Sequence, residues 1–272
     1  MFKKYLLLLF LFCHVSCYAQ YITVCSWNLK DFGRSKSEET IKVMATTLKT
    51  FDLIALQEVV PGPAGPQAVA RLVDQLNRTG QAWSYTVSMP TSGTAYSSER
   101  YAFIWKTKKL KIIGDAWLDK KYAATIDREP FLARFKVQKS VFTLVNYHAI
   151  PKAKQPETEI KYLKFFPNLY PQDNLVFCGD FNLPQSHSVF NPLKKMGFES
   201  ALVAQKTSLR QVCIENDCLA SEFDNFYFNS KYVKLQSAGI LHFYKAFETL
   251  KLARKVSDHV PVYFNFILAP RQ

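Results

Sequence analysis

The chain has 272 residues, and 48% of them are hydrophobic, which is ample for a folded core in one large α/β domain or two small ones. The formal net charge of +13 suits a polyanionic partner, either nucleic acid or an anionic membrane surface, and charge alone does not choose between them. The sequence has no internal repeat, low-complexity tract or linker, which excludes a repeat array.

The first residues have the pattern of a secretory signal. Two lysines precede a short apolar run, Tyr5–Phe12, and a polar region that ends in Ala19 follows it. The run is too short to cross a bilayer as a mature helix. We therefore predict a signal peptide over residues 1–20, cleaved after Ala19 or Gln20, and a single domain over residues 21–272 that is secreted or periplasmic.

Two alternatives exist for this segment. A lipid anchor on Cys17 is the less favoured one, because His14 stands where a lipoprotein signal usually has an aliphatic residue. A buried N-terminal helix is the other. Removal of residues 1–20 takes away two lysines and no acids, so the net charge of the mature chain falls from +13 to +11 and stays strongly basic.

Strand-like and helix-like segments alternate in the first part of the mature chain. The pattern predicts, in order, a strand at Tyr21–Trp27, a helix that begins after Ser37 and carries Ile41, Met44, Leu48 and Phe51, a strand at Leu53–Leu56, a loop at Pro61–Pro66, and a helix carrying Val69, Leu72, Val73 and Leu76.

From Trp83 onward the pattern is mostly strands. They are expected at Trp83–Val87, Tyr101–Lys106, Leu110–Ala116, Phe131–Val137, Val141–His148, Leu175–Cys178, Phe223–Phe228, Tyr232–Leu235 and Val260–Ile267, with a helix within Glu157–Phe166 and a short helix after Ser186. Many strands with a few intervening helices favour an α/β fold in which two mixed sheets pack face to face with helices outside, a four-layer sandwich.

Two basic segments invite a nucleic-acid interpretation. Lys161–Phe166 interleaves basic and aromatic residues, but an amphipathic helix that covers a sheet is the favoured interpretation. Lys106–Lys109 links two predicted strands and is expected to be a solvated hairpin turn. Either segment adds to the basic surface without reading base sequence.

The cysteines of the mature chain fall into two classes. Cys25 and Cys178 lie inside apolar strand-like runs and are expected to be small core residues. Cys213 and Cys218 flank a polar loop, and export favours a disulfide between them over free thiols. Their spacing does not suit a zinc site, because no second Cys/His pair follows.

Polar side chains of the kinds that hydrolases use lie at the ends of several predicted strands. They are Asn28, Glu58, His148, Asp180, Asn182, Asp258 and His259. A single strand end of this kind is as easily a polar turn, but strand ends on one edge of a sheet converge on one place. The set predicts one site for a hard cation and for proton transfer.

Five motifs, in order over nearly the whole mature chain, resemble the endonuclease/exonuclease/phosphatase superfamily. They are Ser26-Trp27-Asn28, Leu56-Gln57-Glu58-Val59, Asn146-Tyr147-His148, Gly179-Asp180-Phe181-Asn182 and Ser257-Asp258-His259. Each motif is weak alone, and five in order are strong. The resemblance implies a DNase I-like fold and hydrolysis of phosphoesters.

Within that superfamily the chain most resembles secreted DNase I-type deoxyribonucleases. Glu99-Arg100-Tyr101 resembles the acid of that branch, Arg128-Glu129-Pro130 its phosphate-binding arginine, and Phe223-Asp224-Asn225-Phe226 the segment with its second orienting acid. His148 stands where repair-type abasic-site endonucleases commonly have tyrosine. On the residues alone, a surface ion pair of Arg128 with Glu129 and solvated strand edges at Glu99 and Asp224 are the alternatives.

The resemblance implies two histidine–carboxylate pairs, Glu99 with His148 and Asp224 with His259. Histidine titrates near neutral pH, and a carboxylate on its other ring nitrogen fixes the tautomer. We assign His259 as the base that activates water, and His148 as the group that protonates or polarises the leaving side. The sequence leaves the reverse assignment open.

The remaining residues are assigned to the cation and the phosphate. Asn28, Glu58 and Asp258 offer hard oxygens for Mg²⁺ or Mn²⁺, and the sequence does not decide whether Ca²⁺ is also required. Asp180 and Asn182 are expected to hold a second ion or to orient the phosphate. Arg128, with Asn182, is expected to bind the phosphate, as a bidentate guanidinium can.

The chain also departs from the DNase I pattern. Ser97 stands where that branch has an aromatic residue two places before Glu99, and Tyr96 is one place off, so minor-groove packing by this loop is not expected to carry over. The segment between Cys213 and Cys218 differs from the usual disulfide region of the branch. Its structural calcium sites are therefore not transferred.

Three hypotheses on function follow. The leading one is a secreted, metal-dependent and sequence-nonspecific endodeoxyribonuclease that acts as a monomer, with DNA as substrate and no stable protein partner. The second keeps the fold but hydrolyses a lipid or a small phosphoester, like a sphingomyelinase; the lack of an evident exposed apolar hairpin counts against it. The third is a non-catalytic binding protein, and the retention of the core catalytic groups counts against that.

Overall fold

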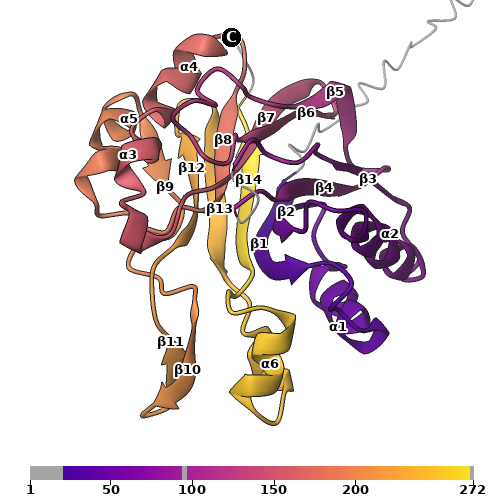
Figure 1. The fold of residues 1–272 in the computed structure, drawn as a ribbon. Helices are drawn as coiled ribbons and strands as arrows, with labels where there is room; N and C mark the ends of the chain where they lie inside the picture. The colour runs from indigo at the N-terminus through magenta and orange to yellow at the C-terminus, as the bar shows by residue number, and fades with distance from the viewer. Residues whose placement is uncertain (1–20, 94–96, 270–272) are drawn as a thin grey trace, which may run out of the picture.

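Two six-stranded sheets form the middle of the molecule (Figure 1). The computed structural model describes residues 21–93 and 97–269, so the predicted signal peptide at residues 1–20 and Tyr96 lie outside the described part. Within that part, no helix combines the length and the apolar character needed to cross a membrane.

Each sheet is mixed, with one parallel pair. The first has the order β13-β14-β1-β2-β4-β3, with strands Val233–Ile240, Val262–Leu268, Ile22–Phe32, Leu53–Val59, Arg100–Lys106 and Trp83–Val87. The second has the order β5-β6-β7-β8-β12-β9, with strands Lys111–Leu118, Phe131–Val137, Ser140–His148, Leu175–Asp180, Asp224–Asn229 and Phe198–Ser200. The parallel pairs are β1 with β2 and β7 with β8.

The two sheets pack face to face, with helices on both outer faces. Aromatic rings fill the middle: Phe103 and Phe142 each contact Phe135, and Phe142 also contacts Phe266 of the opposite sheet. The outer face of the first sheet packs on α1, α2 and α6 (Glu38–Leu48, Ala64–Asn77, Leu250–Val256). That of the second packs on α3, α4 and α5 (Glu157–Ile160, Phe166–Leu169, Asn191–Lys195). The predicted four-layer sandwich is confirmed.

The predicted helices form where capping and spacing favour them. Ser37 accepts a hydrogen bond from the Thr40 N–H and so begins α1, whose buried face includes Ile41 and Leu48. The second helix starts at Ala64, inside the segment predicted to be a loop. A proline in the first helical turn removes no hydrogen bond that the helix needs, which is why Pro66 does not stop it.

Several strands run further than their apolar residues. β1 continues to Phe32, β2 to Val59 and β8 to Asp180, whereas the predicted strands ended at Trp27, Leu56 and Cys178. Pairing with a neighbouring strand, not side-chain polarity, decides where these strands end. The polar residues after the predicted strands therefore sit on sheet backbone.

Two predictions between the strands have different outcomes. The helix predicted within 157–166 is present as α3, and the segment continues as the 3-10 turn η2 (Leu163–Phe165) and the start of α4; it covers the sheet as expected through buried Ile160, Leu163 and Phe166. The other prediction is wrong. The segment 106–109 is not a hairpin turn, because β4 belongs to the first sheet and β5 to the second. It is the crossover between the sheets.

Elements with weak apolar patterns were not predicted. They are β9, β10 (Leu209–Ile214), β11 (Asp217–Leu219), α6 and the 3-10 turns η1 and η4 (Lys152–Lys154, Phe243–Ala246). The short helix predicted after Ser186 is present as the 3-10 turn η3 (Ser188–Phe190) followed by α5. The hairpin β10–β11 projects beside α6 at one end of the molecule (Figure 1). The predicted Cys213–Cys218 disulfide closes this hairpin, and Cys25 and Cys178 are buried free thiols as expected.

A buried amide pair joins the two sheets behind the strand ends. Gln57 of β2 donates from Nε2 to Oδ1 of Asn146 of β7 at 2.6 Å and to Oγ of Ser26 at 3.0 Å. Asn146 in turn donates to the carbonyl of Leu56 at 3.0 Å. Since buried polar groups are costly unless paired, these contacts fix how the sheets lie against each other at this edge.

A substitution at Gly179 tests how closely the backbones of β7 and β8 approach each other. Its φ is +134°, and a Cβ there would lie 1.8 Å from the carbonyl oxygen of Tyr147. We expect Gly179→Ala to lower the free energy of unfolding by about 3 kcal/mol or more, because backbone must move to admit the methyl group. Urea unfolding measures this change.

Gly62→Ala is the matched control, since no atom lies within 4 Å of the Cβ it would add. Its expected effect is within about 0.5 kcal/mol. Equal stability of the two variants would contradict the described approach of the strands.

Candidate active site

The predicted site residues gather where strands of both sheets end. In the second sheet His148 is paired in register with Asp180, and Asp180 with Asp224. In the first sheet Asn28 is paired with Gln57, next to Glu58. Because the sheets pack face to face, these two edges meet, and the polar side chains of both come together.

His148 forms the first histidine–carboxylate pair. Its Nδ1 lies 2.9 Å from Oε2 of Glu99, and both side chains are buried. Burial and Arg128 lower the pKa of His148, but Glu99 and Asp180 outweigh them and the net shift is upward. Burial likewise opposes ionisation of Glu99, yet His148 and Arg128 hold the pKa of this carboxyl below its usual range. The imidazolium–carboxylate form is therefore favoured.

His259 forms the second pair. Its Nδ1 lies 2.7 Å from Oδ2 of Asp224, which is 2% exposed. Burial opposes the charged ring, but Asp224 and Asp180 raise the pKa of His259 to about 10. Burial also raises the pKa of Asp224, against the effect of His259. The short contact between Nδ1 of His259 and the Asp224 carboxyl stabilises the protonated ring.

Asp180 lies between the two rings. Its Oδ2 is 3.5 Å from Nε2 of His148, 3.6 Å from Nε2 of His259 and 3.2 Å from Nδ2 of Asn28. The carboxylate is almost fully buried, and the two histidines, which outweigh burial, keep its pKa low. Both Nε2 atoms, which are the free nitrogens of the two pairs, therefore face the same point.

Asn182 holds the turn after β8. Its φ is 52°, a conformation that asparagine tolerates, and its N–H donates to Oδ1 of Asp180 at 2.9 Å. The side-chain NH₂ donates to the carbonyl of Ala149 at 3.0 Å. Asn182 thus joins the strand ends that carry His148 and Asp180.

Arg128 is buried beside the first pair and is not in a surface ion pair. It donates to Oε2 of Glu99 at 3.2 Å, to the carbonyl of His148 at 3.1 Å and to that of Ala149. Glu129, the expected partner under the alternative interpretation, is fully buried and accepts instead from Ser92. Glu99 and Asp224 are buried too, so neither is a solvated strand edge.

Asn28 and Glu58 lie together, and Asp258 does not join them. Nδ2 of Asn28 donates to Oε1 of Glu58 at 2.8 Å, while its Oδ1 accepts from the Lys30 N–H at 3.0 Å. The carboxylate of Asp258 is instead bound to Lys30 and Arg254, each at 3.2 Å. Its partners are thus two cations, whereas Asn28 and Glu58 bind each other.

The carboxylates that suit a divalent cation are those of Glu58 and Asp180. Asn28 reaches both with one NH₂ group, and carboxylate oxygens are the ligands that Mg²⁺ and Mn²⁺ take in proteins. Asp180, Asp224 and His259 also offer ligand atoms within 4.8 Å of one another. In that second set, however, Asp224 and His259 already bind each other, whereas Glu58 has no imidazole partner in the described chain.

Sequence reasoning missed residues that hold this site in place. Thr207 Oγ1 donates to Oδ2 of Asp224 at 2.6 Å and accepts from the N–H groups of Phe223 and Asp224. It precedes β10 and carries no motif, so no sequence signal marks it. Ser257 was quoted only within a motif; its Oγ donates to the carbonyl of Asn28 and accepts from the His259 N–H.

Lys36 was also missed. Its Nζ is buried and donates to the carbonyls of Lys255 and Val256, at 3.0 and 2.8 Å, where α6 ends just before the Ser257–His259 turn. Burial lowers the pKa of Lys36 to about 8. A cation at the end of a helix meets free carbonyls, so Lys36 anchors this turn to the loop after β1.

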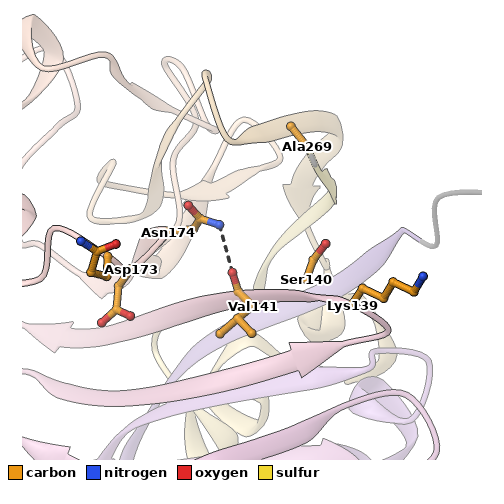
Figure 2. A pocket seen from close by; sticks show the side chains of 7 residues that line it. Lys139, Ser140, Val141, Asp173, Asn174 and Ala269 are labelled. Carbon is orange, nitrogen blue, oxygen red and sulfur yellow. Dashed lines mark hydrogen bonds between the residues drawn. The ribbon is translucent and has the colours of Figure 1, made fainter. Parts of the chain in front are cut away.

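One sizeable pocket lies away from the site. It has a volume of ≈ 340 Å³ and is lined by residues that include Ser140, Asp173 and Asn174 (Figure 2). These residues precede or begin the parallel strands β7 and β8, whereas His148 and Asp180 end them. The pocket is therefore at the opposite end of the sheet.

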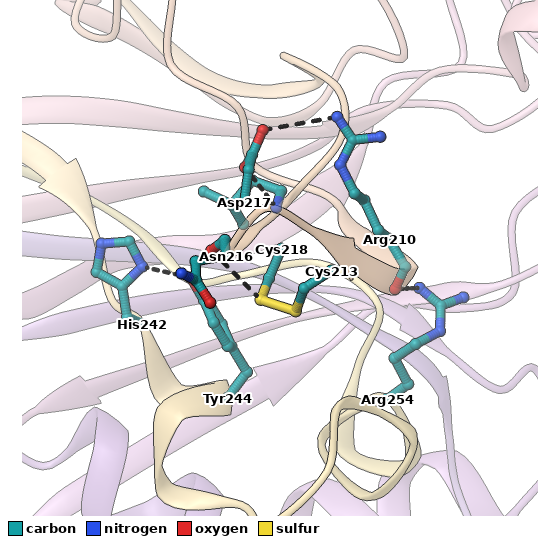
Figure 3. The surroundings of a disulfide bond; sticks show 9 residues. Arg210, Cys213, Asn216, Asp217, Cys218, His242, Tyr244 and Arg254 are labelled. Carbon is teal, nitrogen blue, oxygen red and sulfur yellow. Dashed lines mark hydrogen bonds and ion pairs between the residues drawn. A yellow bond between two sulfur atoms is a disulfide. The ribbon is translucent and has the colours of Figure 1, made fainter.

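The hairpin β10–β11 starts at the site and corrects one expectation. Ser208 pairs with His259 and the Leu209 N–H donates to the Asp258 carbonyl at 2.7 Å, so the base of the hairpin is joined to the Ser257–His259 turn. Figure 3 shows the disulfide at its far end. Val212 is 75% and Ile214 58% exposed, so the chain does have an exposed apolar hairpin.

Comparisons with known proteins place the chain in a family. The model of the Endonuclease/Exonuclease/phosphatase family matches residues 25–259. A deoxyribonuclease of Thioalkalivibrio sp. (strain K90mix) is 26% identical over 90% of this chain and 71% of its own length. Human deoxyribonuclease gamma is 27% identical over 89% of this chain and 85% of its own.

A solved structure supports the fold alone. An endonuclease/exonuclease/phosphatase family protein from Bacteroides thetaiotaomicron superimposes with a TM-score of 0.68 at 17% identity, covering 92% of this chain and 99% of that one. The family match spans more than half of the chain. The chain therefore belongs to the endonuclease/exonuclease/phosphatase family, in its DNase I-like branch, and is a hydrolase that acts on phosphoester bonds.

Proposed function

We propose that this hydrolase is a metal-dependent, sequence-nonspecific endodeoxyribonuclease. The observation that carries the proposal is a row of five groups in which two paired imidazoles face one carboxylate. Four of them, Glu99, His148, Asp180 and Asp224, are buried, and His259 is partly exposed. Phosphodiester hydrolysis needs a base, an acid and charge compensation at one point, and this row supplies groups for the first two. The deoxyribonuclease names of the relatives support DNA as the substrate.

His259 is the proposed base. Asp224 holds its Nδ1 and leaves Nε2 toward the position of the reacting water. The ring must be neutral to accept a proton, while its pKa is about 10 in the protein alone. Positive charge near Asp180, from a cation, would weaken the attraction that keeps the ring protonated and bring the pKa toward neutrality.

His148 is the proposed acid on the leaving side. Its upward pKa shift, caused by Glu99 and Asp180, favours the protonated ring, and Glu99 fixes its orientation. Arg128 and Asn182 are proposed to bind the phosphate. Arg128 would use the N–H groups that remain after its contacts with Glu99 and the carbonyls of His148 and Ala149.

Glu58 and Asp180 are the proposed ligands of Mg²⁺ or Mn²⁺, with Asn28 as the residue that orients them. Asn28 presents its NH₂ group to both carboxylates, so its oxygen would need a second lone pair to reach a cation. Such a cation offsets charge on a phosphate and polarises it. Asp258, bound by Lys30 and Arg254, is not included in this set.

The basic charge of the chain supports a nucleic-acid substrate that is bound through its phosphate backbone. The net charge of +13, or +11 after loss of residues 1–20 with their two lysines, attracts phosphates whatever the base sequence, which suits a nonspecific nuclease. We further propose that the enzyme is exported after loss of residues 1–20 and acts as a monomer without a stable partner. The Cys213–Cys218 disulfide supports export, since disulfides persist in oxidising compartments.

The exposed hairpin supports a second candidate. Val212 and Ile214 stand on a projecting hairpin near the site, as would suit a phosphodiesterase that acts on lipid head groups at a membrane surface. Hydrolysis of sphingomyelin in place of DNA would favour it. The row of catalytic groups is the same for both substrates.

Substitution of the two histidines tests the chemistry. We expect purified protein to nick supercoiled plasmid with Mg²⁺ and not with chelator, and His148→Ala and His259→Ala each to lower the rate by about a hundredfold or more. His242→Ala, which removes an exposed imidazole, is the control. If intact plasmid persists while sphingomyelin is cleaved, the second candidate is correct; if neither reacts with any divalent metal, a binding role replaces both.

The raised pKa of His259 predicts a pH dependence of stability. Between pH 6.5 and about 10, the His259 ring keeps its proton in the folded state, whereas in the unfolded chain the ring has lost it. Stability from this group is therefore complete below pH 6.5 and falls as pH rises, by at most about 1.4 kcal/mol per unit. Lys36 acts in the opposite direction above pH 8. The free energy of unfolding, measured with urea, should fall less steeply between pH 6.5 and 8 in His259→Asn than in the wild type. An unchanged pH dependence would contradict the raised pKa of His259.

Thr207 should act through Asp224. Thr207→Val removes the hydroxyl that supports this carboxylate at nearly constant volume. We expect a loss of about 1–3 kcal/mol in stability and a lower kcat, together with a changed pKa of His259 measured by NMR. Thr207→Ser should restore the kcat and the pKa. An unchanged His259 titration would limit Thr207 to a structural role.

A further inference from the structure

A hollow of ≈ 450 Å³ opens between the loop after β1 and helix α2. Its lining residues are Arg34, Ala64, Gln67 and Arg71. We call it the Arg34 hollow. Arg34 stands in the loop after β1, and the other three belong to α2, so two connections that leave neighbouring strands form its walls.

The walls of the hollow are packed tightly against each other. The Val60 N–H donates to the carbonyl of Phe32 at 3.1 Å, which joins the two connections at their base. A Cβ on Gly65, in the first turn of α2, would lie 2.1 Å from the Val60 carbonyl oxygen, so α2 approaches this backbone as closely as glycine allows. The hollow is held open by backbone contacts.

Arg71 strengthens the same frame. Its guanidinium donates to the carbonyl of Lys36 at 3.1 Å and to that of Gly33 at 3.4 Å, and it pairs with Glu38 at 2.8 Å. It therefore fixes the loop that carries Arg34. About a third of its side chain, 35%, stays exposed toward solvent.

Arg34 supplies the unpaired positive charge of the hollow within the described part of the chain. It is exposed, and within residues 21–93 and 97–269 no hydrogen bond or ion pair engages its guanidinium. The lining contains two arginines and one glutamine and no acid, and Glu38 is bound to Arg71. Such a hollow attracts an anion, and a guanidinium matches the geometry of a phosphate.

The Arg34 hollow lies within reach of the reacting centre. Arg34 follows Asn28 by six residues, and Ala64 follows Glu58 by six. Six residues span at most about 20 Å, and a DNA strand advances about 3.4 Å per nucleotide. A polynucleotide of a few nucleotides can therefore occupy both places at once.

We propose that the Arg34 hollow binds a backbone phosphate of the polynucleotide a few nucleotides from the bond that is cleaved. The proposal rests on the nuclease function proposed above. The contact is to phosphate and not to base edges, so it adds affinity without sequence preference. It also makes activity on long substrates depend on Arg34, while hydrolysis of a small phosphodiester does not.

The test compares Arg34→Gln with Arg78→Gln, which removes the same charge at the exposed far end of α2. Binding of a labelled 20-base-pair DNA duplex is measured by fluorescence anisotropy in chelator, where no cleavage occurs, at several salt concentrations. Arg34→Gln should raise the Kd roughly three- to tenfold near 0.1 M salt and lower the salt slope by about one. Arg34→Glu should weaken binding further, and Arg78→Gln should change it by less than about twofold.

Hydrolysis of bis(p-nitrophenyl) phosphate, which is too small to reach the hollow, should be the same in all variants. Equal Kd values and salt slopes for Arg34→Gln and Arg78→Gln would overturn the hollow as a phosphate site while wild-type DNA cleavage leaves the nuclease function standing. Loss of small-ester hydrolysis in Arg34→Gln would contradict the proposal that Arg34 contacts a phosphate away from the bond that is cleaved. A wild-type protein that neither binds nor cleaves DNA, but whose binding to phosphatidylserine vesicles depends on Arg34, would overturn both proposals.

Discussion

A row of alternating charges, buried where the two sheets end, is the constraint on which the rest of the structure depends. Glu99, His148, Asp180, His259 and Asp224 follow one another at contacts from 2.7 to 3.6 Å. Each carboxylate in it is at most 5% exposed. Buried charges of this kind are stable only with partners in place, so both sheets must present their ends in one arrangement.

The backbone around this row is shaped to meet that demand. Glu58 and Asn182 have positive φ values, 57° and 52°, and Gly179 packs against the Tyr147 backbone. Such conformations are costly and persist where surrounding contacts fix them. The buried Gln57–Asn146 amide contact, directly behind the site, provides part of that fixation by joining the two sheets. Strain at the strand ends and hydrogen bonds behind them thus act together.

Two further features, the hairpin β10–β11 and the Arg34 hollow, adjoin the segments that carry the site residues. The hairpin β10–β11 extends from Ser208, beside His259, and the Arg34 hollow opens from the loop after β1. One presents exposed apolar side chains and the other free cationic charge. Both adjoin segments that carry site residues, and in the functions proposed above they supply recognition while other groups act on the phosphate.

Much of this protein was readable from its sequence. Apolar runs gave the positions of most strands, and the polar residues at their ends named the groups that meet in the site, because residue type and short-range spacing are local properties. The same local signals failed at β9, β10, β11 and α6, whose apolar patterns are weak, and at 106–109, whose flanking strands pair in different sheets. Pairing partners are a tertiary property that periodicity does not encode.

The site itself divides in the same way. The sequence by itself determined which acids, amides and histidines were available and, through the family resemblance, which histidine goes with which acid. Only the tertiary structure decided that Arg128 supports Glu99, that Thr207 supports Asp224 and that Asp258 is taken up by Lys30 and Arg254. These contacts join residues far apart in the chain or on unmarked loops, and their choice depends on distances that exist only once the two sheets have packed.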